Sequence, residues 1–194
     1  KYTIISQSTF YLSKNITERD RIMNSHDTDN IILCGFMASG KTSVAKALSK
    51  ELGFSYVDTD ELIMKESNMT IPEIFDKYGE EHFRDLEFEI AKKLKNFNKT
   101  IISTGGGMLT FDRNAKVLKE AGTIIHIKRE FDDIYQTLLN DTTRPLANQK
   151  TKEELRELYD KRLIKYVANS DHMVHNNVFA NCVKDIIKIH RKKC

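Results

Sequence analysis

Gly35-Phe36-Met37-Ala38-Ser39-Gly40-Lys41-Thr42 is the stretch that decides the fold, because it matches GxxxxGK[ST], the pattern of a phosphate-binding loop. It follows Ile31-Ile32-Leu33-Cys34, a short apolar run typical of a strand buried on both faces. Apolar residues recur at helical spacing after it, before Gly53: Val44, Ala45, Leu48 and Leu52. A strand, a turn and a helix N-terminus in this order direct backbone N–H groups at one point and favour a bound polyphosphate there.

The same pattern predicts the nucleotide contacts. Lys41 is expected to reach the β- and γ-phosphates, and the Thr42 hydroxyl is expected to ligate Mg²⁺. A chance match in a long loop is the alternative, and the strand and helix on either side argue against it. The expected nucleotide-binding residues of the loop are Ala38, Ser39, Gly40, Lys41, Thr42 and Ser43.

Composition limits the class of protein. The 194 residues suffice for one domain with a full core, and a formal net charge of +3 is too small to indicate nucleic acid or a membrane surface as partner. Cys34, Cys182 and Cys194 lack metal-ligand spacing and are expected to be free thiols in a reducing compartment. No apolar run approaches the roughly 18 residues of a membrane span, and the first residues lack the layout of a secretory signal. We therefore expect a cytoplasmic protein.

The first 30 residues follow neither a strand nor a helix period, so we treat residues 1–30 as an N-terminal extension and 31–194 as the domain. Met23 lies eight residues before Ile31, and we hypothesise that it is the physiological start.

Strand-like and helix-like segments alternate after the phosphate loop, which predicts an α/β fold with a parallel sheet covered on both faces. Expected strands are residues 31–34, 54–57, 100–104, 123–127 and 173–175. Helices are expected to begin after the phosphate loop and near Glu61, and to cover 71–78, 80–97, 112–121, 130–140, 155–166 and 179–187.

Several charged residues and glycines lie where this fold would use them. Asp58 and Asp60 follow a strand, where open α/β sheets bind ligands. Glu87 falls inside an apolar helical stripe, with Arg84 at its border; a purely structural ion pair is the first alternative on these two residues. Arg162 is a second inward arginine, which calls for a carboxylate or phosphate partner.

Two loop features carry less information by themselves. Gly105-Gly106-Gly107 would let a ligand approach backbone N–H groups, or would simply form a tight turn. Arg144, in the polar connection 140–151, could close on a nucleotide as part of a lid, or could be a solvated charge.

From Ile31 to about Ile187 the chain resembles shikimate kinase. The order and spacing of these motifs carry the resemblance: the phosphate loop, Asp58-Thr59-Asp60, Gly79-Glu80-Glu81-His82-Phe83-Arg84, Ser103-Thr104-Gly105-Gly106-Gly107, Arg144-Pro145-Leu146 and Lys161-Arg162-Leu163. The resemblance implies a three-layer P-loop kinase fold with a five-stranded parallel sheet and a mobile lid. It also implies transfer of the ATP γ-phosphate to the 3-hydroxyl of shikimate, by a monomer that carries one Mg²⁺ with its ATP.

The resemblance also implies roles for individual residues. Arg84, Arg162 and the Gly106 N–H would hold the shikimate carboxylate, and Glu87 would hold Arg84. Asp60 would bind the ring hydroxyls and accept a proton, so that the implied catalytic residues are Lys41, Asp60 and Arg144. Arg144 would close over the phosphates, while Thr42 and Asp58 would lie in the Mg²⁺ shell.

The chain also departs from the family. Leu163-Ile164 replaces an Ala-Pro common in the family and is expected to alter local packing, and the expected adenine-contact regions offer only Thr137 and Asn176-Asn177. Two other functions stay open: a related kinase for gluconate or a nucleotide, and a catalytically inactive binding module. Two inward arginines disfavour a neutral nucleobase, and the presence of Lys41, Asp60 and Arg144 disfavours an inactive module.

Overall fold

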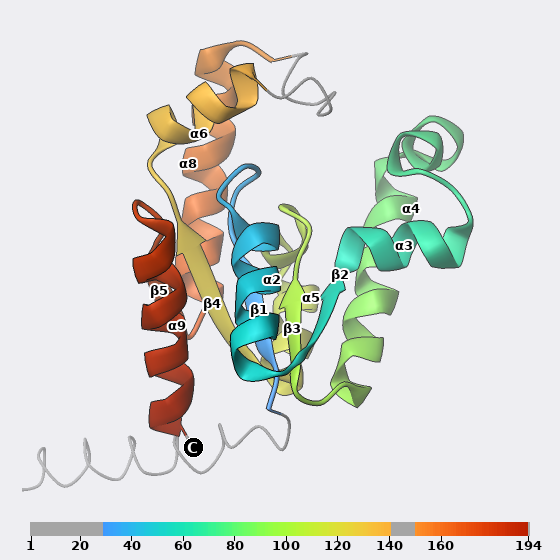
Figure 1. Ribbon diagram of the computed structural model, residues 1–194. Helices are drawn as coiled ribbons and strands as arrows, with labels where there is room; N and C mark the ends of the chain where they lie inside the picture. The colour runs from blue at the N-terminus through green and yellow to red at the C-terminus, as the bar shows by residue number, and fades with distance from the viewer. Residues whose placement is uncertain (1–28, 141–149, 194) are drawn as a thin grey trace, which may run out of the picture.

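The computed structural model describes residues 29–140 and 150–193 (Figure 1). Met23, with most of the expected N-terminal extension, and Arg144 of the expected lid lie outside these ranges. A five-stranded parallel sheet in the order β2-β3-β1-β4-β5 forms the centre of the molecule, as predicted. Its strands are β1 (Ile31–Cys34), β2 (Ser55–Asp58), β3 (Thr100–Ser103), β4 (Thr123–Lys128) and β5 (His172–His175).

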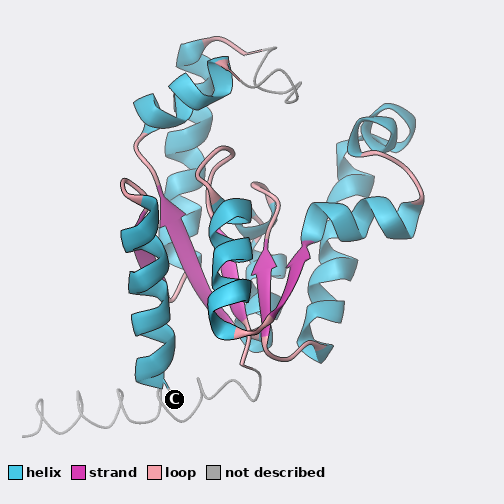
Figure 2. Ribbon diagram, in the orientation of Figure 1, coloured by secondary structure: helices cyan, strands magenta, loops and turns pink. Residues whose placement is uncertain are grey.

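Helices cover both faces of the sheet (Figure 2). α2 and α9 pack together on one face, whereas α5 and α8 contact β4 from the other. The helices are α2 (Lys41–Leu52), α3 (Thr59–Ser67), α4 (Ile71–Lys93), α5 (Asp112–Ala121), α6 (Phe131–Leu139), α8 (Lys152–Asn169) and α9 (Phe179–Lys193).

Alternation along β1 explains why the whole strand is apolar. Ile31 and Leu33 pack in the core beneath α2 and α9, while Ile32 and Cys34 pack in the core of the opposite face. Successive side chains of a strand point to opposite faces, so a strand with helices on both sides needs apolar residues throughout. Burial also raises the pKa of the Cys34 thiol to about 12, which leaves it protonated and unreactive.

α3 and the first part of α4 form an arm that projects beyond β2 (Figure 1). Thr70 caps α4 by accepting a hydrogen bond from the Glu73 N–H, and Pro72 lies in the first turn. Gly79 lies inside the helix with φ 81° and ψ 177°, a conformation that suits glycine and produces a kink. The residues on either side of Gly79 therefore form two helical segments, as predicted, that meet at a kink within α4.

Most predicted elements are confirmed, with shifts of one to a few residues at their ends. The helix expected near Glu61 begins at Thr59, because Asp58 caps it by accepting from the Asp60 N–H. The helix expected to reach Phe97 ends at Lys93, and a single 3₁₀ turn, η1 (Leu94–Asn96), follows it. None of the helices in the described ranges is long and apolar enough to cross a bilayer.

Candidate active site

The phosphate loop joins β1 to α2 at the carboxyl end of the sheet. The side chain of Lys41 folds back onto the phosphate loop, where its Nζ donates to the carbonyl oxygens of Gly35 (2.8 Å) and Phe36 (2.9 Å). Ala38 takes a left-handed conformation, with φ 57°, that is uncommon for a residue with a side chain. The loop therefore surrounds an ammonium group at the N-terminus of α2, where cation and helix dipole together favour the phosphates of a nucleotide.

Two side chains from distant strands fasten this loop. Arg129, just after β4, donates from Nη1 to the Ala38 carbonyl (3.1 Å), and Asn176, just after β5, donates from Nδ2 to the Ser39 carbonyl (2.8 Å). A Cβ at Gly40 would overlap the Asn176 amide, so that position needs glycine. Sequence reasoning missed Arg129 and placed Asn176 only in an adenine-contact region, because neither contact follows from the chain order.

Thr42 and Asp58 face each other across the edge of the loop, with Thr42 Oγ1 and Asp58 Oδ2 3.5 Å apart. A hydroxyl and a carboxylate are hard oxygen ligands of the kind that Mg²⁺ prefers, so the pair fits the ion expected with a nucleotide. Tyr56 lies on the same carboxylate, with its hydroxyl 3.5 Å from Asp58 Oδ2. Burial, followed by the charge of Asp58, raises the pKa of Tyr56 to about 12, so it stays a neutral donor.

The predicted acceptor-binding side chains all pack against the glycine triplet, residues 105–107. A Cβ at Gly105 would overlap Asp60 Oδ1, and one at Gly107 would lie 2.5 Å from Arg84 Nη1. At Gly106 the added atom would lie 3.5 Å from Arg162 Nη1. Helices α3, α4 and α8 thus bring one polar side chain each against one glycine. The triplet is more than a tight turn, because the missing side chains make room for these groups.

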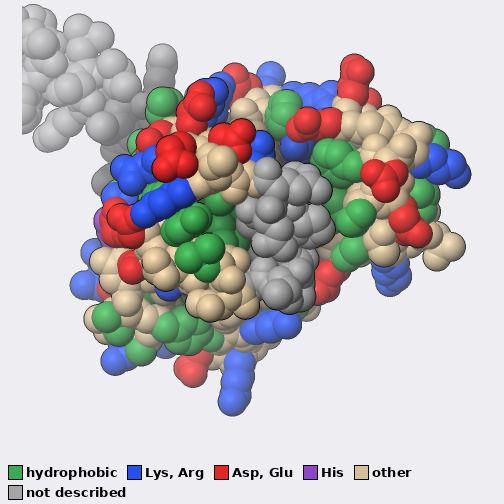
Figure 3. Space-filling model, turned by 90° about the horizontal axis from the view of Figure 1, so that it is seen from above, with side chains coloured by type: hydrophobic (Ala, Val, Ile, Leu, Met, Phe, Trp, Pro, Cys, Tyr) green, Lys and Arg blue, Asp and Glu red, His purple; other side chains and the backbone are tan. Residues whose placement is uncertain are grey.

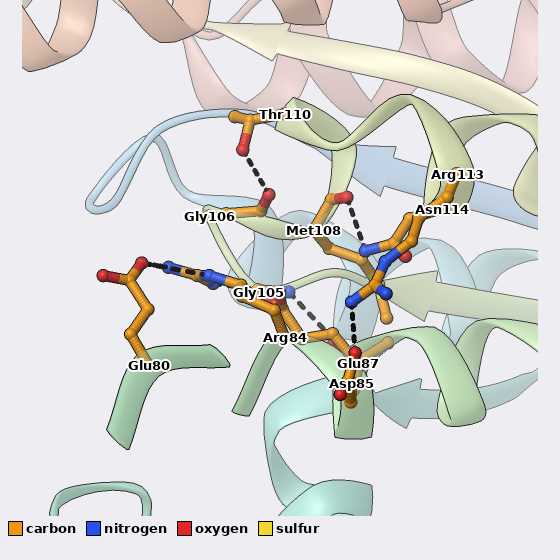
Figure 4. Close-up of polar contacts among 12 residues, drawn as sticks. Glu80, Arg84, Asp85, Glu87, Gly105, Gly106, Met108, Thr110, Arg113 and Asn114 are labelled. Atoms are coloured by element: carbon orange, nitrogen blue, oxygen red, sulfur yellow. Dashed lines mark hydrogen bonds and ion pairs between the residues drawn. The ribbon is translucent and has the colours of Figure 1, made fainter. Parts of the chain in front are cut away.

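Arg84 and Glu87 form the ion pair that the apolar stripe predicts (Figure 4). Arg84 Nη1 lies 2.9 Å from Glu87 Oε2, and the Glu87 side chain is 1% exposed. Burial raises the pKa of Glu87, and the charge of Arg84 opposes that shift. Burial lowers the pKa of Arg84, but Glu87 and Glu80 more than offset this, so the net pKa is raised. The guanidinium therefore stays charged and fixed in place.

Tyr166 lies one helical turn after Arg162 on α8 and supports the backbone of the glycine triplet. Its hydroxyl donates to the Gly106 carbonyl oxygen, and its ring lies 5.1 Å from that of buried His126. Burial, with the positive charge of Lys41, lowers the pKa of His126 to about 4, so this histidine is neutral near pH 7. Sequence reasoning gave Tyr166 no role.

Two other expectations concern packing and adenine contacts. Leu163 packs against the core and Ile164 is exposed, which agrees with a purely local effect of this departure. The Thr137 hydroxyl donates to the Asp133 carbonyl within α6, so the structure gives it a local partner. Among residues 29–140 and 150–193, no group of three or more His, Cys, Asp or Glu could hold a metal by itself.

A family model described as shikimate kinase matches residues 37–190. The chain belongs to the shikimate kinase family. A shikimate kinase of Thermodesulfovibrio yellowstonii is 44% identical over 138 residues, which cover 71% of this chain and 80% of the relative. One from Staphylococcus aureus is 39% identical over 142 residues, covering 73% of this chain and 81% of the relative.

Solved shikimate kinases share the fold. The structure from Acinetobacter baumannii, in complex with shikimate, matches with a TM-score of 0.77 and 29% identity, over 84% of this chain and 93% of that one. The structure from Aquifex aeolicus matches with a TM-score of 0.69 and 32% identity, over 84% and 96%. The predicted family and three-layer fold are therefore confirmed.

Proposed function

We propose that this chain transfers the γ-phosphate of ATP to the 3-hydroxyl of shikimate and so forms shikimate 3-phosphate for aromatic amino-acid (chorismate) biosynthesis. One observation carries the proposal: Asp60, Arg84 and Arg162 converge on the glycine triplet beside a complete phosphate loop. The two arginines suit an anionic group of an acceptor, and the carboxylate of Asp60 suits its hydroxyls. The glycines leave room for such a molecule to approach the backbone. Membership of the shikimate kinase family supports the same acceptor.

The proposed mechanism relies on positioning and electrostatics. Arg84, Arg162 and the Gly106 N–H hold the carboxylate of the acceptor, which fixes the ring over Asp60. Asp60 orients the attacking hydroxyl and accepts its proton, while Lys41 neutralises charge on the transferred phosphoryl group. Such transfer requires little covalent chemistry from the protein, so alignment of the reacting groups is its main contribution.

Three further assignments complete the proposal. Thr42 and Asp58 would hold one Mg²⁺, which when bound neutralises phosphate charge. Ala38, Ser39, Gly40 and Ser43 would supply backbone and side-chain contacts to the phosphates, and Arg144 would close over them.

The partners we propose are small molecules, bound by a cytoplasmic monomer. Figure 3, which looks down on the end of the molecule where the strands finish, shows cationic and anionic side chains interspersed over the described surface. A mixed surface of this kind does not favour nucleic acid or a membrane as partner.

The test is ATP consumption by the purified protein with Mg²⁺, in the presence of shikimate, gluconate, a nucleoside monophosphate or no acceptor. We expect turnover with shikimate alone, and its loss in the Asp60→Asn variant while ATP still binds. Turnover with gluconate or the nucleotide would assign a related kinase activity instead. ATP binding without turnover on any acceptor would indicate an inactive binding module.

A further inference from the structure

The guanidinium of Arg84 is enclosed on most sides. Its Nη1 donates to buried Glu87 and lies against Gly107, and its central carbon lies 5.2 Å from the ring centres of both Phe83 and Phe111. The side chain is accordingly only 13% exposed. An anion arriving from solvent therefore has to reach the remaining edge, formed by Nε and Nη2.

Glu80 already occupies that edge. Its Oε1 accepts from Arg84 Nε (3.2 Å) and from Nη2 (2.7 Å). Figure 4 shows Glu80 reaching the guanidinium of Arg84, and Glu87 binds Nη1 of the same group. The two carboxylates differ in burial, because Glu80 is 64% exposed and Glu87 is 1% exposed. Glu87 is therefore fixed, whereas Glu80 can rotate into solvent at low cost.

We infer that Glu80 is an internal competitor for the acceptor: it pairs with the exposed edge of Arg84 until the carboxylate of the acceptor displaces it. The inference rests on the proposed function, in which Arg84 binds that carboxylate. Both anions need the same pair of N–H groups, and two carboxylates at one edge repel each other, so they bind alternately.

Competition of this kind affects specificity. A planar anion regains both hydrogen bonds when it replaces Glu80, but a neutral acceptor would leave Arg84 with fewer hydrogen bonds. An acceptor without a carboxylate therefore leaves Glu80 paired with Arg84, whereas the correct acceptor displaces Glu80 and binds slightly more weakly for that reason.

The experiment compares Glu80→Gln with Glu81→Gln, a matched control that removes the same charge from the adjacent exposed position. We expect Glu80→Gln to lower the KM for shikimate about two- to fivefold, because an exposed pair at this spacing contributes little. Its kcat and its KM for ATP should stay unchanged, and Glu81→Gln should match the wild type. With the methyl ester of shikimate, which has no carboxylate, the lower KM should disappear.

The opposite results have distinct meanings. A higher KM in Glu80→Gln would show that Glu80 orients Arg84 and would overturn the inference. Equal KM values in both variants, or the same gain with the ester, would also overturn it while the wild type still phosphorylates shikimate. A wild-type protein without turnover on shikimate would refute the proposed function, and the inference would fall with it.

Discussion

Replacing Gly107 by alanine should damage acceptor binding without altering the backbone. Gly107 has φ −95° and ψ −20°, which alanine adopts without strain. The new Cβ, however, would lie 2.5 Å from Arg84 Nη1 and 3.1 Å from its Cζ. Since carbon and nitrogen make ordinary contacts at about 3.5 Å, the guanidinium has to retreat by about 1 Å.

That retreat determines the size of the effect. Arg84 is tied to Glu87, whose side chain is 1% exposed, so it cannot move far without leaving a buried carboxylate poorly paired. Loss of the charged hydrogen bonds to the acceptor costs about 1.5–3 kcal/mol, which is roughly a 10- to 150-fold rise in the KM for shikimate. The KM for ATP should change far less, because Arg84 is held by Glu80, Glu87 and Gly107, whereas the proposed nucleotide contacts are made by the phosphate loop.

The assay measures initial rates while each substrate is varied at a saturating level of the other. Gly53→Ala is the control, because Gly53 ends α2 with φ 69° and its added Cβ meets nothing within 4 Å. This control should lower the free energy of unfolding by about 1 kcal/mol and leave both KM values unchanged. An unchanged KM for shikimate in Gly107→Ala, or an equal rise for both substrates, would refute the reasoning.

Three further changes test other parts of the site. Asn176→Ala removes one hydrogen bond to the phosphate loop and should raise the KM for ATP about 2- to 12-fold in rate assays, with the KM for shikimate unchanged. Tyr166→Phe removes the hydroxyl that holds the Gly106 carbonyl, so titration calorimetry should show shikimate binding weakened by about 1 kcal/mol while ATP binding is retained. His126 has its pKa lowered to about 4 from 6.5, so the unfolded chain binds the proton first and this residue costs stability as pH falls from 6.5 towards 4. In denaturant titrations at several pH values, the free energy of unfolding of His126→Gln should therefore depend less on pH than that of the wild type, by up to about 3 kcal/mol.

The fold was predictable because its signals are local. Ile31–Cys34 has apolar residues throughout, and the glycines and lysine after it specify a loop that only a strand and a helix can flank. The charge pair of Arg84 and Glu87 was equally visible, because a carboxylate inside an apolar helical stripe needs a partner within one turn.

What sequence reasoning missed depends on contacts between distant segments. Arg129 reaches the phosphate loop only because β4 lies beside β1 in the sheet, and nothing in the residues around it indicates that order. Likewise, the match of each glycine in the triplet to one side chain from α3, α4 or α8 becomes visible only when the helices are placed. Glu80 was overlooked for a different reason: an exposed glutamate four residues before an arginine is an ordinary surface pattern.

The hydrogen bond from Asn176 to Ser39 affects how the protein folds while it is being translated. It joins residues 137 positions apart. The phosphate loop, near the start of the domain, therefore lacks this hydrogen bond until a residue near the end of the domain has been synthesised. On the ribosome, β1, β3 and α2 can collapse together early, but β5 and Asn176 emerge only after most of this domain has been made. A nascent chain that stops before β5 should therefore contain the whole phosphate-binding motif and still bind nucleotide poorly. Full affinity for ATP would therefore arise only after the last strand of the sheet has been made and has folded.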